Sequence, residues 1–294
     1  MLARPGAGGD NAPMRSLTVP APSKINLVLH VTGRRADGYH ELESLFVALD
    51  FGDTVTLACR DDGVIQREVD LPGVPVAADL AVRAAQALQR ETGSPHGVDI
   101  SVGKRIPQGA GLGGGSSDAA SVLLALNRLW GLDLPRAALM RIGLGLGADV
   151  PFFVFGRPAI ARGVGERLSA VSLPAAWAAV LTPSVLVPTA TIFAAPELTR
   201  ATPSAKMDVF SEGYGRNDLQ GVAVARFPDI AAALAALARR SPSARMTGSG
   251  SSVFAIFASE APARAALAAA AQAAPGTSGF VARSLARHPL AAFA

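Results

Sequence analysis

The sequence predicts an α+β protein that is built from two domains. The chain has 294 residues, which is more than most single compact domains contain. Strand-like and helix-like patterns occur in both halves, without the regular alternation of a parallel α/β protein. Half of the residues are hydrophobic and 17% are charged, so the chain can form large buried cores and is not expected to be disordered.

Hydrophobic periodicity places the elements of the first half. We expect strands over Ser23–Thr32 and Asp53–Cys59, because both segments are rich in strand-forming residues and are separated by a polar turn. Asp79–Thr92 has apolar residues at helical spacing, and Gly93 supplies its end. In Val98–Val102, apolar and polar residues alternate as they do in a half-buried strand.

The second half mixes strands and helices in the same way. We expect strands over Trp177–Thr182 and Gly279–Leu285, and helices over Asp229–Arg239 and Pro262–Ala274. Arg245–Ala258 has the pattern of a hairpin that is interrupted by glycine. We therefore expect a disordered tail over residues 1–15, an N-terminal domain over residues 16–165 and a C-terminal domain over residues 166–294.

Composition limits the partners that the chain can have. The net charge is only +4, the basic residues are dispersed and aromatic residues make up 5%, so we expect no nucleic-acid partner. No apolar run is long enough to predict a membrane span or a signal peptide. The single cysteine, Cys59, excludes an intramolecular disulfide. We expect a cytoplasmic protein that is a monomer or a weak homodimer.

The segment Pro107–Ser117 carries the strongest chemical signal. Five of its residues are glycines that let a backbone approach a ligand, and two serines then open a helix whose N-terminus attracts anions. A flexible turn with a serine cap is the alternative, but the loop lies between a well-patterned strand and helix. We expect phosphate to contact Pro107, Gly109, Gly111, Leu112, Gly113, Gly114, Gly115, Ser116 and Ser117.

Three familiar phosphate-binding loops do not fit this segment. A P-loop needs a lysine after its last glycine, and none is present. Gly109, Gly111 and Gly114 match a dinucleotide fingerprint, but its acidic partner would be Asp133, which follows Gly131 at a helix end rather than a second strand. The H-R-D and D-F-G sequences of protein kinases are absent.

Three segments together resemble the GHMP kinases, which phosphorylate small molecules such as galactose, homoserine and mevalonate. They are APSKINLVL at Ala21–Leu29, PQGAGLGGGSSDAA in the loop, and MTGSGSSVF at Met246–Phe254, in the same order as in that family. The resemblance implies that the N-terminal domain is a nucleotide-binding domain that binds ATP, that the C-terminal domain is a ferredoxin-like α+β domain that binds the substrate, and that the active site lies in the cleft between them. It also implies ATP as co-substrate with Mg²⁺.

The segments PSKINLVLHVTGRRADGYHELES and GADVPFFVFG narrow the resemblance to one branch of this family. In that branch, the phosphate of ATP passes to the 2-hydroxyl of a methylerythritol linked to cytidine diphosphate, in the non-mevalonate route to isoprenoids. Two alternatives remain open. The chain could be another GHMP kinase, acting on homoserine or a sugar, or a sensor that binds the nucleotide without turnover.

The resemblance implies that Asp149 is the base that accepts the proton of the attacking hydroxyl, with Lys24 beside it. Asn26 lies on the same strand face as Lys24 by period-2 alternation, so it is expected at the substrate. From the residues alone, Asp149 also fits a turn or a helix cap before Val150-Pro151. Asp118 follows the serines where some members of the family have Asn, and an acid also suits the first turn of a helix.

Four residues are expected to hold the cytidine end of the substrate. The resemblance implies that Tyr39 and His40 hold the base, that Phe193 stacks on its other side, and that Thr189 lies nearby. Surface-loop residues and an ordinary core phenylalanine are the alternatives. The second glycine-rich turn is expected to pack against the phosphate loop, with Gly248 and Ser249 near the substrate. The histidine spacing predicts no protein metal site.

Overall fold

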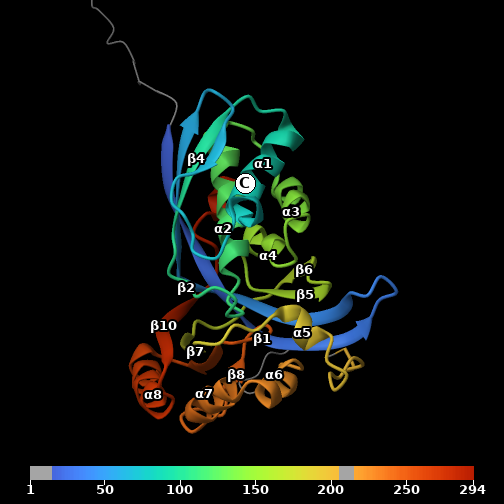
Figure 1. Ribbon diagram of the computed structural model, residues 1–294, viewed down its shortest axis with the longest axis vertical. Coiled ribbons are helices and arrows are strands. Elements are labelled where there is room, and N and C mark those ends of the chain that lie inside the picture. Colours follow the sequence, from blue (N-terminus) through green and yellow to red (C-terminus); the bar gives the residue numbers. More distant parts are fainter. Residues whose placement is uncertain (1–14, 205–214) are drawn as a thin grey trace, which may run out of the picture.

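The computed structural model describes residues 15–204 and 215–294 (Figure 1). Within these residues, ten strands form one sheet. They are β1 (Ser16–Arg34), β2 (His40–Arg60), β3 (Ile65–Arg67), β4 (Gly97–Gly103), β5 (Ala159–Gly163), β6 (Arg167–Ala170), β7 (Trp177–Pro183), β8 (Arg245–Met246), β9 (Val253–Phe257) and β10 (Thr277–Leu285). Except for residue 15, the expected tail over residues 1–15 lies outside the described residues.

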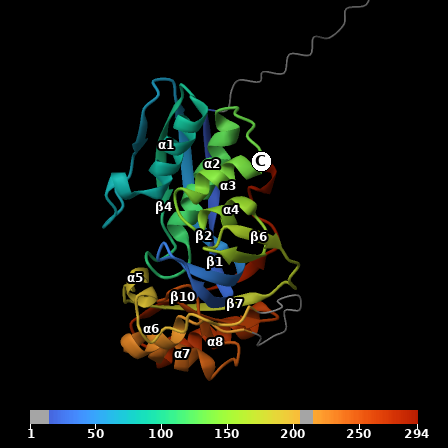
Figure 2. The same cartoon turned by 90° about the vertical axis from the view of Figure 1, so that its right-hand side faces the viewer.

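Helices cover the sheet in two groups, which Figures 1 and 2 show at opposite ends of the molecule. The first group comprises α1 (Leu80–Thr92), α2 (Gly114–Leu129), α3 (Arg136–Leu144) and α4 (Val150–Phe155). The second comprises α6 (Gln220–Arg226), α7 (Pro228–Ala238) and α8 (Glu260–Ala273). The short helix α5 (Thr189–Phe193) lies beside the hairpin of β1 and β2 (Figure 1). The α+β class is confirmed.

The two longest strands, β1 and β2, run from the end that carries α1 and α2 to the middle of the molecule, where their hairpin curves above the second group of helices (Figure 1). They pair antiparallel along almost their whole length, with three register shifts, at residues 22–24, 26–28 and 31–33. The expected strand Asp53–Cys59 is therefore only the C-terminal part of β2. The N-terminal part was missed because residues 44–49 are all buried, and a short apolar run without alternation fits a strand or a buried helix equally well.

The second half folds in the order β7, helices α5 to α7, β8, β9, α8, β10. Its sheet order, β10-β7-β9-β8, is fully antiparallel, which is the ferredoxin-like arrangement. After β10 the chain returns to the first group of helices, where the carbonyl of Phe293 accepts a hydrogen bond from Asn127 Nδ2 at 3.2 Å. The domain boundary after residue 165 falls in the turn between β5 and β6 and stays a prediction.

The helices begin and end where local chemistry favours it. Asp79 caps α1, because its side chain accepts a hydrogen bond from the backbone N–H of Ala81 at 2.9 Å. Gly93 ends this helix in the left-handed conformation, with φ 66°. The helix after the glycine loop is confirmed as α2, but it begins at Gly114, two residues before the expected serines.

Apolar side chains form three clusters. The first holds α1 and α2 against the sheet and includes Leu57 and Leu123. The second lies under α7 and α8 and includes Ile230. The third lies between them and joins Ile25 of β1 to Phe254 of β9, so it connects the two ends of the molecule. Within the described residues, no single helix is long and apolar enough to cross a membrane. Only α6 and α7 together reach that length and composition, and the two helices are bent by 118° relative to each other.

Replacement of Leu123 by alanine tests the first cluster. Leu123 is fully buried, so Leu123→Ala should lower the free energy of unfolding by about 2–5 kcal/mol. Urea unfolding measures this loss. Val69→Ala is the matched control, because Val69 is 52% exposed and its truncation should change stability by less than about 0.5 kcal/mol. Equal losses in the two variants would contradict this packing.

Candidate active site

A cavity of about 880 Å³ lies where the β1–β2 hairpin, the phosphate loop, α5 and the second glycine-rich turn meet. This volume is suited to a ligand of nucleotide size. Its wall contains thirteen of the residues that the sequence predicts as site residues: Lys24, Asn26, Tyr39, His40, Gly109, Gly111, Gly113, Ser116, Asp149, Thr189, Phe193, Gly248 and Ser249.

Five predicted residues of the phosphate loop do not line the cavity: Pro107, Leu112, Gly114, Gly115 and Ser117. Ser117 is fully buried, its backbone N–H donates to the carbonyl of Gly113, and its hydroxyl has no partner. Leu112 is 1% exposed, and its carbonyl accepts a hydrogen bond from the backbone N–H of Lys24. Ser116, rather than Ser117, therefore presents its side chain to the cavity.

The phosphate loop needs glycine for conformation and for space. Gly109, Gly111 and Gly113 have φ values of 64°, 76° and 72°, which L side chains rarely adopt. A Cβ atom on Gly111 would lie 2.3 Å from the carbonyl oxygen of Thr247. The loop leads directly into α2, whose first N–H groups have no partner within the helix. This arrangement suits the binding of a phosphate.

The second glycine-rich turn packs against this loop, as the sequence predicts. The backbone N–H of Ser252 donates to the carbonyl of Ala110 at 3.1 Å. Asn217 supports the turn from the other side, because its Nδ2 donates to the carbonyls of Met246 and Gly248 at 2.9 and 2.8 Å. Sequence reasoning missed Asn217, since nothing in its neighbourhood distinguishes it from a loop asparagine.

Lys24 and Asp149 meet beside the phosphate loop. Lys24 Nζ lies 3.3 Å from Asp149 Oδ2, and the two side chains are 4% and 32% exposed. Lys24 Nζ also donates to Asn26 Oδ1 at 2.7 Å and lies over the ring of Phe46. The ammonium is thus held by the protein, whereas the carboxylate, at the start of α4, stays accessible from the cavity. Such a pair can accept a proton and stabilise negative charge.

Asn26 is occupied mainly by neighbouring protein groups. Its Oδ1 accepts hydrogen bonds from Thr247 Oγ1 at 3.2 Å and from the backbone N–H of Gly248 at 3.0 Å. Its Nδ2 donates to Ser44 Oγ at 2.8 Å. Although Asn26 lines the cavity, it is 2% exposed. It therefore joins β1, β2 and the second glycine-rich turn around Lys24.

Aromatic rings form the other end of the cavity. The rings of His40 and Phe193 are 5.0 Å apart and tilted by 32°, so they touch and leave no room for a base between them. Tyr39 is 66% exposed at the tip of the hairpin. Arg200, which the sequence did not indicate, donates from Nε to His40 Nε2 at 3.1 Å. Burial lowers the pKa of His40, and the charges of Arg200 and Arg34 lower it further.

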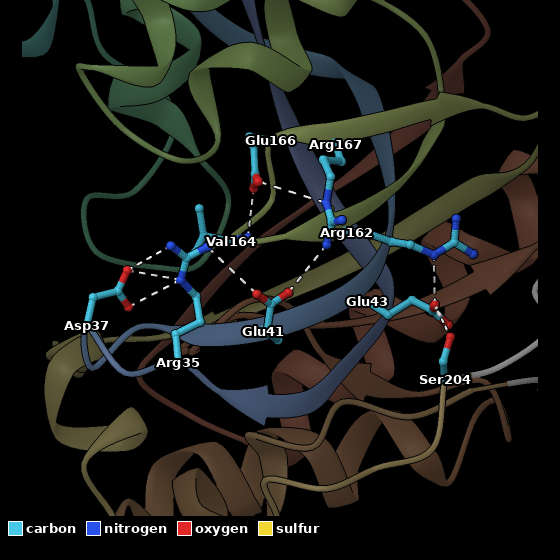
Figure 3. A network of polar contacts seen from close by, with 9 residues as sticks. All are labelled: Arg35, Asp37, Glu41, Glu43, Arg162, Val164, Glu166, Arg167 and Ser204. Carbon is cyan, nitrogen blue, oxygen red and sulfur yellow. Dashed lines mark hydrogen bonds and ion pairs between the residues drawn. The ribbon is translucent and has the colours of Figure 1, made fainter.

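An ion-pair network braces this hairpin (Figure 3). Glu41 lies between Arg35 and Arg167, with N–O distances of 3.7 and 3.4 Å. Arg35 also pairs with Asp37 at 2.8 Å. The network ends at the turn after β5, where Glu166 accepts a hydrogen bond from the backbone N–H of Val164. The hairpin that carries Tyr39 is therefore tied to the wall that carries Val164.

A buried charge cluster lies under the root of the phosphate loop. Lys104 Nζ donates to Asp53 and, at 2.8 Å, to Asp118. Asp53 also accepts hydrogen bonds from the backbone N–H groups of Arg105 and Ile106, which fixes the start of the loop. Burial raises the pKa of Asp118 to about 7 despite Lys104, and its Oδ1 has no partner. Asp118 thus belongs to this cluster and does not line the cavity.

Comparison with known proteins identifies the class. Residues 79–157 match the family "GHMP kinases N terminal domain", and residues 197–276 match "GHMP kinases C terminal". The chain belongs to the GHMP kinase family. A relative from Thiobacillus denitrificans, named 4-diphosphocytidyl-2-C-methyl-D-erythritol kinase, is 58% identical over 276 residues, which cover 94% of this chain and 98% of the relative. A relative of the same name from Cupriavidus necator is 54% identical, and the match covers 94% and 95%.

Solved structures agree with this assignment. A crystal structure of 4-(cytidine 5'-diphospho)-2C-methyl-D-erythritol kinase is 36% identical, with a TM-score of 0.79, and the match covers 91% of this chain and 99% of that one. Homoserine kinase from Cytophaga hutchinsonii is 18% identical, with a TM-score of 0.72 and coverage of 95% and 97%, and so shares the fold. The resemblance that the sequence motifs indicate is confirmed.

Asp118→Asn tests the buried charge cluster. The folded-state pKa of Asp118 is raised, so its contribution to stability is present below about pH 4 and is lost as the pH rises through about 7. Asparagine does not titrate. The variant should therefore gain stability relative to the native chain between pH 5 and pH 8, by about 1–3 kcal/mol. Urea unfolding at pH 5, 6.5 and 8 measures the difference.

The matched control for this measurement is Asp70→Asn, which removes one carboxylate whose side chain is fully exposed. A difference between Asp118→Asn and the native chain that stays constant or reverses with rising pH would show that the cluster does not favour protonated Asp118.

Glu41→Gln tests the ion-pair network of the hairpin. Its pairs are partly exposed, so each contributes about 0.2–1 kcal/mol. Amide hydrogen exchange over residues 35–42 should become about two- to fivefold faster, and 0.5 M salt should reduce the difference. Glu68→Gln, at an exposed site away from the hairpin, is the control. Unchanged exchange at low salt would mean that the network does not hold the hairpin.

Proposed function

We propose that this chain transfers the γ-phosphate of ATP to the 2-hydroxyl of 4-diphosphocytidyl-2-C-methyl-D-erythritol, as a step in the non-mevalonate route to isoprenoid precursors. The single observation that carries the proposal is the cavity, which joins the phosphate loop, the Lys24–Asp149 pair and the aromatic end in one space. The names of its relatives support the choice of acceptor.

The phosphate loop would hold the triphosphate of ATP at Gly109, Gly111, Gly113 and the first turn of α2, where backbone N–H groups and open space suit phosphate oxygens. Magnesium would supply charge neutralisation at the β- and γ-phosphates. Among the described residues, no three His, Cys, Asp or Glu side chains group as a metal site. Ser116 and Asp149 line the same cavity, and their side chains carry the oxygen ligands that magnesium prefers.

Asp149 would accept the proton of the attacking hydroxyl, because its carboxylate is the acidic group that lies beside the phosphate loop and remains accessible. Lys24 would stabilise the negative charge that develops on the transferring group. The transfer is direct, so the protein forms no covalent phosphoryl intermediate. A phosphorylated enzyme that passes its phosphate to the acceptor would contradict this mechanism.

The cytidine end would lie against Tyr39, His40 and Phe193, with Thr189 and Ser249 nearby. Their flat rings suit a flat base. Thr189 Oγ1 and Ser249 Oγ are 2.8 Å apart, so α5 and the second glycine-rich turn form one polar edge of the cavity. Since the His40 and Phe193 rings touch, the base would lie against this pair rather than between its rings.

The proposal includes a cytoplasmic location, where ATP is plentiful, and a monomer or weak homodimer. The one cysteine supports a reducing compartment, because a chain with one thiol forms no internal disulfide. Burial raises the pKa of the Cys59 thiol, which makes it poorly reactive.

ADP release in the presence of magnesium, ATP and the cytidine-linked acceptor tests the function. The native chain should turn over, and Asp149→Asn should lose about 10²–10⁴-fold in kcat, as expected for removal of a general base. Asp133→Asn is the control, because Asp133 lies outside the cavity and its φ of 48° suits asparagine. Turnover with homoserine or galactose but not with the cytidine-linked compound would contradict the proposed acceptor. No ADP release with any acceptor would favour a sensor that binds the nucleotide without turnover.

A further inference from the structure

Arg200 connects two walls of the cavity through four hydrogen bonds. Its Nε donates to His40 Nε2 at 3.1 Å. Its two terminal nitrogens donate to the carbonyls of Phe193 at 2.9 Å, Ala195 at 2.6 Å and Leu198 at 3.1 Å. The guanidinium thus holds the end of α5 and the imidazole of the hairpin in one rigid arrangement. Arg200 lines the same cavity.

The direction of the bond to His40 decides which imidazole nitrogen carries the proton. The Arg200 Nε–H group only donates, so His40 Nε2 must be the acceptor. A neutral imidazole that accepts at Nε2 carries its proton on Nδ1. Within the described residues, Arg200 is the only hydrogen-bond partner of the His40 imidazole, and His40 lines the cavity, so its Nδ1–H group is left for a ligand.

We infer that Arg200 is a positioning residue that makes the site selective for cytosine, because it fixes His40 in the tautomer that presents an N–H donor to the base. This inference rests on the proposed function, in which His40 contacts the pyrimidine. Cytosine offers two neighbouring acceptors, N3 and O2. Uracil has an N–H donor at position 3, which a fixed donor opposes. The selectivity is therefore set by a residue 160 positions away from His40.

The contact with Phe193 supports this role. The His40 ring already lies against the Phe193 ring, and Arg200 holds the carbonyl of the same phenylalanine. The imidazole is therefore fixed in position by its tilted contact with the Phe193 ring and in protonation by Arg200. A histidine without the arginine would be free to exchange its two neutral tautomers and to offer an acceptor in place of the donor.

Nitrogen-15 NMR of the free protein at pH 7.5 is the first test, and it needs neither substrate nor turnover. The His40 signals, assigned by comparison with His40→Asn, should show a protonated Nδ1 and an unprotonated Nε2. In Arg200→Met and Arg200→Lys this pattern should be lost, although Arg200→Lys keeps the positive charge and can still bond a carbonyl. Arg226→Met is the control, because Arg226 bonds the carbonyl of Thr191 in α5 but does not touch His40.

Binding of CDP and UDP, measured by calorimetry, is the second test. The native chain and Arg226→Met should prefer CDP by about tenfold or more, since a site built to hydrogen-bond one ligand rejects an analogue with the wrong group. Arg200→Lys should lose most of this preference. In Arg200→Lys, the KM for the cytidine-linked acceptor should rise about tenfold, while kcat should change less than about threefold. Arg200 acts on the binding of the acceptor and not on the transfer of phosphate.

The outcomes separate the inference from the proposed function. A native His40 with its proton on Nε2, or Arg200 variants that keep both the tautomer and the preference for CDP, would overturn the inference. The native chain could also show the expected tautomer and the preference for CDP but no turnover. That result would refute the proposed function and leave the inference standing. Thermal unfolding of Arg200→Lys should match that of the native chain within a few degrees, which excludes general loss of the fold as the cause.

Discussion

The ion pair between Lys24 and Asp149 lies at the centre of the site, because three separate segments must meet for it to form. β1 supplies Lys24, and its backbone N–H is fixed by the carbonyl of Leu112 in the phosphate loop. The start of α4 supplies Asp149. A Cβ atom on Gly113 would lie 3.0 Å from Lys24 Cγ and 3.1 Å from the Phe153 ring, and its φ of 72° is strained for other residues, so glycine favours the closure of the loop over the lysine. The glycine-rich loop and the Lys24–Asp149 pair are thus brought together by the same packing.

The long β1–β2 hairpin explains why one cavity contains both the phosphate loop and the aromatic end. Its strands extend from the first group of helices to a position above the second group (Figure 1). Lys24 and His40 of these strands both line the cavity. The ferredoxin-like half supplies α5 and the second glycine-rich turn across the cavity. Charged groups hold the tip of the hairpin from one side (Figure 3), and Arg200 holds it from the other.

Sequence alone predicted those parts of the site that are encoded locally. The phosphate loop was evident because its glycines, the preceding strand and the following helix are consecutive. Arg200, Asn217 and Lys104 were missed, since each acts through partners that only the tertiary fold brings near; Arg200 bonds His40 across 160 positions. Ser117 was expected in the phosphate site because it follows the glycines, but the helical turn directs it into the interior. The N-terminal part of β2 was missed because full burial removes the alternation of apolar and polar residues by which strands are recognised.

Lys24 and Asp149 must act as one unit in the proposed mechanism, and a double-mutant cycle on kcat tests this most directly. The variants are Lys24→Met, Asp149→Asn and the pair combined, with Asp133→Asn as a background control. When two residues act as a unit, removal of either one abolishes almost all of their joint contribution to kcat. The double variant should therefore be about as slow as the slower single variant. If the two groups act independently, the double variant will instead be slower by the product of the two single effects. That result would contradict the proposed joint action of Lys24 and Asp149.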